Sequence, residues 1–355
     1  MEILRTPDRY FEILKDYPFK PHYTEIDAFE GRILRIHHLD EGEAESPIVL
    51  CLHGQPSWSY LYRKMVPYLV SAGLRVLAPD LPGYGKSDKP AAREDYTYQR
   101  QVDWMGRWLV ANNLSNVNIF GQDWGGLIGL RLVADYPDRF ARVIMGNTGL
   151  PYNPDLPGDV VERVARFRNE AKTPSLREMA MAVSKLVGPE AFAYWQKFCW
   201  ETEDIPVGLL MSMMIERLPA RRLLPKLLMH RFLGKTSQPP KDLAEAYEAP
   251  FPDPRYKMGV RAMPSRVPTL PTDPSLSAQA SAWDFFDKFE PPFLCLFTAD
   301  DPITRGLEKT FINRVPGARG LNHQVFPNGG HFLQEHRHKE LCKAIVQLIF
   351  GEPSP

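Results

Sequence analysis

The sequence has no excess of charge of either sign and no long hydrophobic run. Its 355 residues include 43 basic and 43 acidic ones, so the formal net charge is zero. Nucleic-acid-binding proteins are normally basic, and disordered chains combine low hydrophobicity with high net charge, whereas 44% of these residues are apolar. No apolar stretch reaches the roughly 18 residues of a membrane-spanning helix. We therefore expect a folded protein with no nucleic-acid partner and no membrane segment, long enough for about two domains.

Cysteine is scarce, and no residues show the spacing of a metal site. The cysteines form no Cys-x-x-Cys pair and lie far apart, at Cys51, Cys199, Cys295 and Cys342. We expect free, reduced thiols. His37 and His38 fall in an alternating, strand-like run, where successive side chains face opposite ways and cannot bind one metal together. The first 19 residues contain charged residues throughout, beginning with Glu2, and no apolar stretch of signal-peptide length. A cytoplasmic location is therefore expected.

Short apolar or β-branched runs alternate with segments of helical length. The expected strands are Ile48–His53, Arg75–Asp80, Val117–Gln122, Ala141–Met145, Phe293–Ala299 and Gln324–Phe326. The clearest expected helices are Tyr60–Ala72, Tyr98–Asn112, Leu127–Asp135 and Glu335–Phe350. This alternation predicts an α/β fold, with a mostly parallel sheet covered by helices on both faces. Ligands bind such sheets beyond the carboxyl ends of the strands.

Proline, in contrast, is abundant, and its positions suggest an insertion. The 34 prolines amount to about twice the average usage of roughly 5%. Between Pro151 and Trp283 no convincing strand occurs and prolines break the helix-like segments, ending in the proline-rich stretch Ala249–Pro274. We expect a core domain formed by residues 1–150 and 283–355 and a helical cap domain formed by residues 151–282.

The segment VNIFGQDWGG, Val117–Gly126, has the pattern of a nucleophile elbow. In that motif a strand runs through a sharp Gly-x-nucleophile-x-Gly turn into a helix and exposes the central side chain. Here the central residue is Asp123, between Gly121 and Gly125. An aspartate that only caps the following helix is the alternative interpretation.

Two later segments and one earlier segment favour the catalytic interpretation. The strand at Phe293 leads into Asp300 and Asp301, and the strand at Gln324 leads to His331. Nucleophile, acid and histidine follow one another in this order in α/β-hydrolases. Either aspartate is a candidate acid, and the continuation Asp-Pro-Ile-Thr favours Asp301. His53–Pro56 follows an earlier strand, where such enzymes supply one N–H of the oxyanion hole.

Together these segments resemble the haloalkane dehalogenases, in particular the subfamily whose second halide ligand is a tryptophan of the cap. The resemblance covers nearly the whole chain except part of the cap. It is carried by HGQPSWSYLYRKM (His53–Met65), DLPGYGKSDKP (Asp80–Pro90), QDWGG (Gln122–Gly126), APFPDPRYKMGVR (Ala249–Arg261) and GGHFLQE (Gly329–Glu335). It implies an α/β-hydrolase fold with an inserted helical cap, and a hydrolase that acts on carbon–halogen bonds.

The residue types suit that chemistry. A carboxylate is ionised at neutral pH, so Asp123 can attack an sp³ carbon without a base and form an alkyl ester. His331, oriented by Asp301, would then take a proton from the water that cleaves the ester. The backbone N–H groups of Gln55 and Trp124 would stabilise the oxyanion. No cofactor or metal is needed, and the partners are a small neutral halogenated substrate, a halide ion and water.

The leaving halide needs hydrogen-bond donors, and the indole N–H is a donor only. Trp124 follows the proposed nucleophile and is the first candidate. The resemblance points to Trp195, in the cap segment FAYWQKF, as the second. The weaker alternatives are Trp58, Trp200 and Trp283.

Other functions and two departures from the family pattern stay open. An epoxide hydrolase would share Asp123 and aim cap tyrosines at the opening oxygen, for which Tyr152, Tyr194 and Tyr247 are available. A binding protein without catalytic activity is also compatible with the fold. The position of Gln55 carries Glu or Asn in the family, where Glu orients the hydrolytic water and Asn donates to the halide. The basic stretch Glu216–Lys235 is expected to be an amphipathic cap helix with a solvated cationic face.

Overall fold

The centre of the molecule is an eight-stranded sheet, seen in a computed structural model that describes residues 1–14, 16–186, 188–216 and 243–351. The strand order is β10-β9-β8-β7-β4-β5-β3-β2. In chain order the strands are β2 (His22–Asp27), β3 (Ile33–Glu41), β4 (Ile48–Leu52), β5 (Arg75–Pro79), β7 (Val117–Gln122), β8 (Phe140–Gly146), β9 (Phe293–Thr298) and β10 (Gln324–Phe326). A separate two-stranded sheet pairs β1 (Ile3–Leu4) with β6 (Lys89–Pro90).

The six strands from β10 to β5 are parallel to one another, and β3 and β2 add an antiparallel edge. All six expected strands are present, with ends that differ by at most one residue. Every residue of β7 and β9 is buried, as parallel strands covered on both faces require. The expected α/β fold is therefore confirmed.

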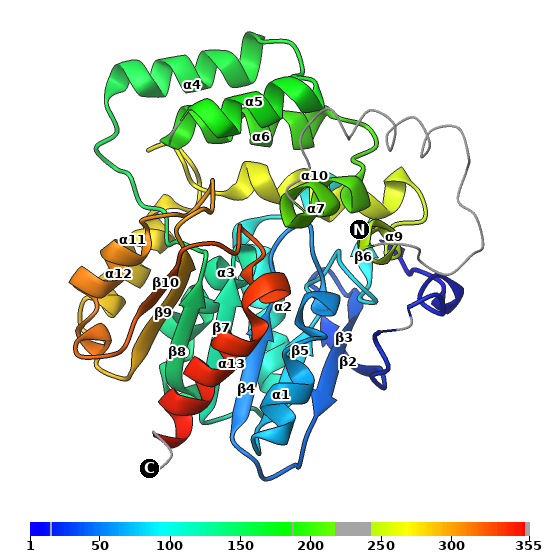
Figure 1. The fold of residues 1–355 in the computed structure, drawn as a ribbon. Helices are drawn as coiled ribbons and strands as arrows, with labels where there is room; N and C mark the ends of the chain where they lie inside the picture. Colours follow the sequence, from blue (N-terminus) through cyan, green and yellow to red (C-terminus); the bar gives the residue numbers. More distant parts are fainter. Residues whose placement is uncertain (15, 187, 217–242, 352–355) are drawn as a thin grey trace.

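Helices cover both faces of the sheet. Figure 1 shows α1 (Val66–Ser71) and α13 (Leu333–Phe350) in front, and α2 (Tyr98–Ala111) and α3 (Trp124–Asp135) behind. The remaining core helices are α11 (Leu276–Phe286) and α12 (Glu308–Arg314).

The prediction of one continuous helix over Tyr60–Ala72 is wrong. A short 3₁₀ turn, Ser59–Tyr62, comes first, and α1 begins only at Val66. Pro67 explains the break, because a residue without an N–H and with a fixed φ is tolerated only in the first turn of a helix.

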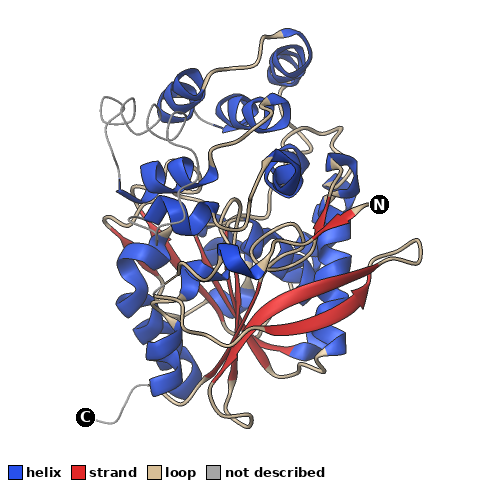
Figure 2. Cartoon of the chain, turned by 90° about the vertical axis from the view of Figure 1, so that its right-hand side faces the viewer, coloured by secondary structure: helices blue, strands red, loops and turns tan. Residues whose placement is uncertain are grey.

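A layer of helices lies above the ends of the strands, on the side where β7 ends (Figures 1 and 2). Its helices are α4 (Gly158–Glu170), α5 (Leu176–Lys185), α6 (Gly188–Glu201), α7 (Val207–Glu216), α9 (Leu243–Glu248) and α10 (Met258–Ala262). The part of residues 151–282 that the structure describes contains no strand. Of the basic stretch only Glu216, the end of α7, is described, so its expected helix lies outside the described residues. The domain boundaries at residues 151 and 282 stay a prediction.

Two expectations about composition can be compared with the structure. All four cysteines are free and buried. No helix in the described part of the chain has the length and hydrophobicity needed to cross a membrane.

Candidate active site

The turn after β7 has the geometry of a nucleophile elbow. Asp123 adopts φ 51° and ψ −126°, a conformation that is strained for any residue other than glycine. The next residue begins α3, which packs closely on the end of β4. A Cβ on Gly125 would lie 1.9 Å from the carbonyl oxygen of Leu52, so only glycine fits there. The two glycines of the motif thus allow the close approach that the sequence indicated.

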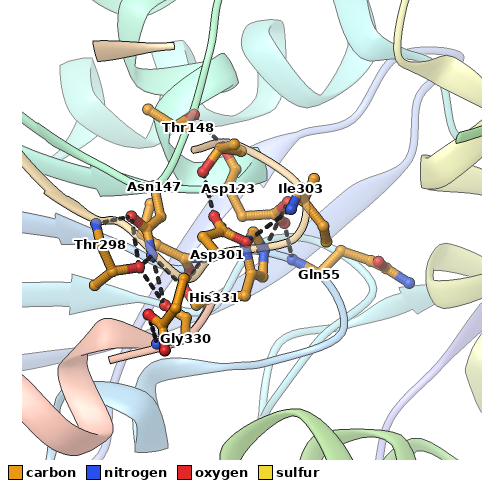
Figure 3. Close-up of polar contacts among 12 residues, drawn as sticks. Gln55, Asp123, Asn147, Thr148, Thr298, Asp301, Ile303, Gly330 and His331 are labelled. Atoms are coloured by element: carbon orange, nitrogen blue, oxygen red, sulfur yellow. Dashed lines mark hydrogen bonds and ion pairs between the residues drawn. The ribbon is translucent and has the colours of Figure 1, made fainter. Parts of the chain in front are cut away.

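The Asp123 side chain does not cap α3, so the helix-cap interpretation is wrong. Its Oδ1 instead accepts a hydrogen bond of 2.7 Å from the backbone N–H of Gln55, which follows β4. Its Oδ2 lies 3.4 Å from Nε2 of His331, which follows β10. Three strand ends therefore meet at one carboxylate that is 19% exposed (Figure 3).

Asp301, rather than Asp300, is the acid that contacts His331. Both carboxylate oxygens of Asp301 lie close to Nδ1 of His331, at 3.1 and 3.0 Å. Asp301 is fully buried and also accepts hydrogen bonds from the N–H of Ile303, at 2.9 Å, and from the hydroxyl of Thr304. Asp300 accepts a hydrogen bond from the N–H of Gly330 instead.

The two carboxylates determine the charge state of His331. Burial disfavours the imidazolium, but Asp301 and Asp123 outweigh burial and raise the pKa of His331 to about 10. Burial likewise disfavours the ionised form of Asp301, while His331 and Thr304 hold the pKa of its carboxyl below the usual value. Both carboxylates therefore favour the imidazolium form of His331 in the resting site.

Sequence reasoning missed the side chains that hold the loop before α13. The side-chain amide of Asn147, just after β8, donates hydrogen bonds to the carbonyls of Gly330 (2.7 Å) and His331 (3.0 Å). Its own carbonyl accepts from the backbone N–H of Thr298, at the end of β9. The amide of Gln122 also donates to the carbonyl of His331, at 3.1 Å. A polar residue at the end of a buried strand was the only available signal.

A buried ion-pair cluster fixes the start of α13. The carboxylate of Glu335 lies 2.6 Å from the guanidinium of Arg63 and 2.8 Å from the ammonium of Lys64. It also accepts a hydrogen bond of 2.7 Å from the hydroxyl of Tyr247 on α9. Burial raises the pKa of the Glu335 carboxyl, but Arg63 and Lys64 hold it below the usual value. Because its hydroxyl is engaged here, Tyr247 is not a free donor for an opening epoxide.

Known proteins resemble this chain over its whole length. A family model described as the alpha/beta hydrolase fold matches residues 47–175. The haloalkane dehalogenase from Psychrobacter cryohalolentis is 42% identical to this chain, in an alignment that covers 99% of this chain and 100% of the relative. The haloalkane dehalogenase from Mycolicibacterium paratuberculosis is 40% identical, in an alignment that covers 98% of each chain. The structure of the tetrameric haloalkane dehalogenase from Paraglaciecola agarilytica NO2 aligns over 100% of both chains, with 26% identity and a TM-score of 0.73. The chain belongs to the haloalkane dehalogenase family.

For a haloalkane dehalogenase, a candidate halide ligand is a tryptophan whose indole N–H is not already engaged by the protein. In the described part of the chain, neither Trp124 nor Trp195 donates an indole hydrogen bond. The indole N–H groups of Trp104 and Trp108 also lack a partner among the described residues, but both side chains are fully buried on α2. Trp124 is buried against Tyr98, and Trp195 lies on α6 in the helical layer. The indole N–H groups of Trp58 and Trp283 donate to the backbone carbonyls of Ala246 and Leu150. The Trp200 ring packs against the guanidinium groups of Arg93 and Arg266.

The side chain of Gln55 extends away from Asp123 and His331 (Figure 3). Its amide Nε2 donates a hydrogen bond of 3.0 Å to the carbonyl of Val260 on α10. The donor is thus committed to the helical layer, and the arrangement argues against an asparagine-like role as halide donor. The described residues include no group of three or more His, Cys, Asp or Glu side chains arranged to hold a metal ion.

Proposed function

We propose that this enzyme hydrolyses haloalkanes to an alcohol, a halide ion and a proton, through an alkyl ester on Asp123. The observation that carries the proposal is the position of the Asp123 carboxylate, partly exposed on a strained turn and 3.4 Å from a histidine that is paired with a buried aspartate. The full-length similarity to haloalkane dehalogenases supports the same chemistry.

In the first step an oxygen of the Asp123 carboxylate attacks the carbon that bears the halogen. A C–O bond forms, the carbon–halogen bond breaks, and the halogen leaves with the bonding electrons. The indole N–H groups of Trp124 and Trp195 hydrogen-bond the halide, which accepts but cannot donate. The proposed helical cap, residues 151–282, carries Trp195 over the site and excludes bulk water.

In the second step water cleaves the ester. Esterification neutralises Asp123 and so removes one of the two negative charges that raise the pKa of His331. The imidazolium then releases its Nε2 proton to solvent, which is the proton of the overall reaction, and Nε2 takes a proton from the water that attacks the ester carbonyl. When the tetrahedral intermediate collapses, the departing alkoxide takes up the imidazolium proton and leaves as the alcohol, and the Asp123 carboxyl returns its own proton to His331. The N–H groups of Gln55 and Trp124 stabilise the oxyanion until the alcohol leaves. Asp301 holds the imidazole with Nδ1–H toward itself.

A direct test measures halide release from 1-bromobutane and 1,2-dibromoethane. The wild-type protein should release halide, and Asp123→Ala should not. No release above that control would refute the proposal. Rapid hydrolysis of styrene oxide without halide release would instead identify an epoxide hydrolase.

Trapping tests the ester itself. In His331→Phe the first step remains possible but the base is missing, so the alkyl enzyme should accumulate. The intact protein should gain the mass of the alkyl group, and peptide mapping should locate it at Asp123. An unchanged mass with a substrate that is shown to bind would contradict the nucleophile role.

A further inference from the structure

Gln122, the last residue of β7, lies directly against the imidazole of His331. Its amide Nε2 is 3.1 Å from the carbonyl oxygen of His331 and 3.2 Å from Nε2 of the ring. A carbonyl oxygen only accepts hydrogen bonds, so the amide nitrogen, and not the amide oxygen, must face this position. The backbone carbonyl of His331 thus determines the orientation of the Gln122 amide, which also contacts the His331 ring.

The other half of the same amide is left without a partner. Gln122 is fully buried, and its Oε1 has no hydrogen-bond partner within the described residues. A buried, unpaired carbonyl destabilises a fold, and an apolar side chain of similar size avoids that loss. Packing alone therefore does not explain a glutamine at this position.

The N–H of Gln122 opposes protonation of His331 at Nε2. With Nδ1–H donated to Asp301, a neutral ring presents the Nε2 lone pair, which accepts from the amide. A proton on Nε2 would turn this contact into two donors facing each other. The charged groups that face the ring are the carboxylates of Asp301 and Asp123, and both favour the protonated form.

We propose that Gln122 is a positioning residue that opposes protonation of Nε2 of His331 in the alkyl-enzyme intermediate, and that its N–H gives up the single Nε2 lone pair when the attacking water transfers its proton there. The inference rests on the proposed function. Once Asp123 is esterified, Asp301 is, of the two carboxylates that face the ring in the described part of the chain, the one that still favours the imidazolium. Burial and the Gln122 N–H then act together against it.

Two substitutions and one matched control separate this role from a structural one. Gln122→Met keeps the volume and removes both the donor and the unpaired carbonyl. Gln122→Glu replaces the donor with an acceptor. Gln279→Met is the control, because Gln279 is also fully buried, also donates to a backbone carbonyl, that of Pro151, and also has an unpartnered Oε1 in the described part of the chain.

The measurement is the rate of ester hydrolysis against pH, followed after rapid mixing as the decay of the alkyl-enzyme mass. The rate depends on deprotonated His331. Gln122→Met should move the apparent pKa of this step upward by about half to one pH unit, the size expected for one hydrogen bond. Gln122→Glu should move it further upward. Gln279→Met should reproduce the wild-type profile.

Superimposable profiles for Gln122→Met and the wild type, or a downward shift, would overturn the proposal. NMR titration of the His331 ring in the resting protein gives a second readout that needs no turnover, and there too Gln122→Met should raise the pKa. If the wild type releases no halide, the proposed function fails, while this titration still tests the contact. If Gln122→Met does not fold, Gln122→Leu decides, because it also removes the donor and adds no charge: an unshifted or lowered pKa there would overturn the proposal.

Discussion

The strained backbone of Asp123 allows a stability test that is separate from catalysis. At φ 51° and ψ −126° a side chain crowds its own backbone, whereas glycine adopts this conformation freely. We therefore compare Asp123→Gly with Asp123→Ala. Both variants remove the carboxylate and its contacts with Gln55 and His331, so these losses cancel. The remaining difference is the presence of Cβ.

The size of the difference follows from two opposing effects. A non-glycine residue in such a region is destabilised by about 1–3 kcal/mol. Glycine gains more freedom in the unfolded chain, which offsets about 0.4–1 kcal/mol. The difference between the midpoints of these two ranges is about 1.3 kcal/mol, so the glycine variant should be more stable than the alanine variant by about that amount, although neither should release halide.

Urea unfolding of the two variants, followed by tryptophan fluorescence, measures the difference. The same pair of substitutions at Glu162, an exposed residue inside α4, is the control, and there alanine should be the more stable residue. An Asp123→Ala variant that is as stable as Asp123→Gly, or more stable, would refute the strain argument.

Three further predictions concern other parts of the site. Gly125→Ala should prevent folding or lower stability by more than about 4 kcal/mol in urea unfolding, because its Cβ would collide with the Leu52 carbonyl, whereas Gly158→Ala, with open space around it, should be tolerated. Glu335→Gln should lower stability at pH 7 by about 3–5 kcal/mol. The pKa of the Glu335 carboxyl is depressed in the folded state, so the stability difference between the wild type and Glu335→Gln should be present above the unfolded-state pKa of about 4.3 and disappear as pH falls through the folded-state pKa. A stability difference that does not change with pH in urea unfolding would contradict this. Trp195→Phe should weaken bromide binding, measured by fluorescence quenching, by about tenfold or more through loss of a hydrogen bond to an ion, and unchanged affinity would exclude Trp195 as a halide donor.

Local patterns explain why much of the fold was predictable. Buried parallel strands are continuous apolar runs, and their ends were placed to within one residue. The elbow was recognisable because two close approaches require glycine on either side of the residue that the turn exposes. A Cβ on Gly121 would collide with the start of α3, and a Cβ on Gly125 would collide with the end of β4. The prediction of one continuous helix over Tyr60–Ala72 was wrong because the apolar pattern continues through Pro67, whereas a helix can contain proline only in its first turn.

The supporting contacts of the site had no comparable signal. Gln122 and His331 are 209 positions apart in the sequence. They meet only because the carboxyl ends of the parallel strands β7 and β10 lie on the same side of the sheet, below the helical layer. Asn147 and Thr298 contact each other through the neighbouring strands β8 and β9. A polar residue at a strand end looks the same in the sequence whether it faces a buried histidine or a helix.

The sequence by itself determined the α/β fold, the elbow at Asp123 and the order of nucleophile, acid and histidine, because these depend on residues that are neighbours along the chain. Only the tertiary structure decided that Asp301 rather than Asp300 contacts His331, that the Gln55 amide is bound to Val260, and that Gln122 contacts the ring of His331. Each of these contacts depends on which side chains the sheet register and the helical layer bring within hydrogen-bond distance. Two aspartates that are neighbours in the sequence, or two glutamines, have the same chemistry, and only the folded chain gives them different partners.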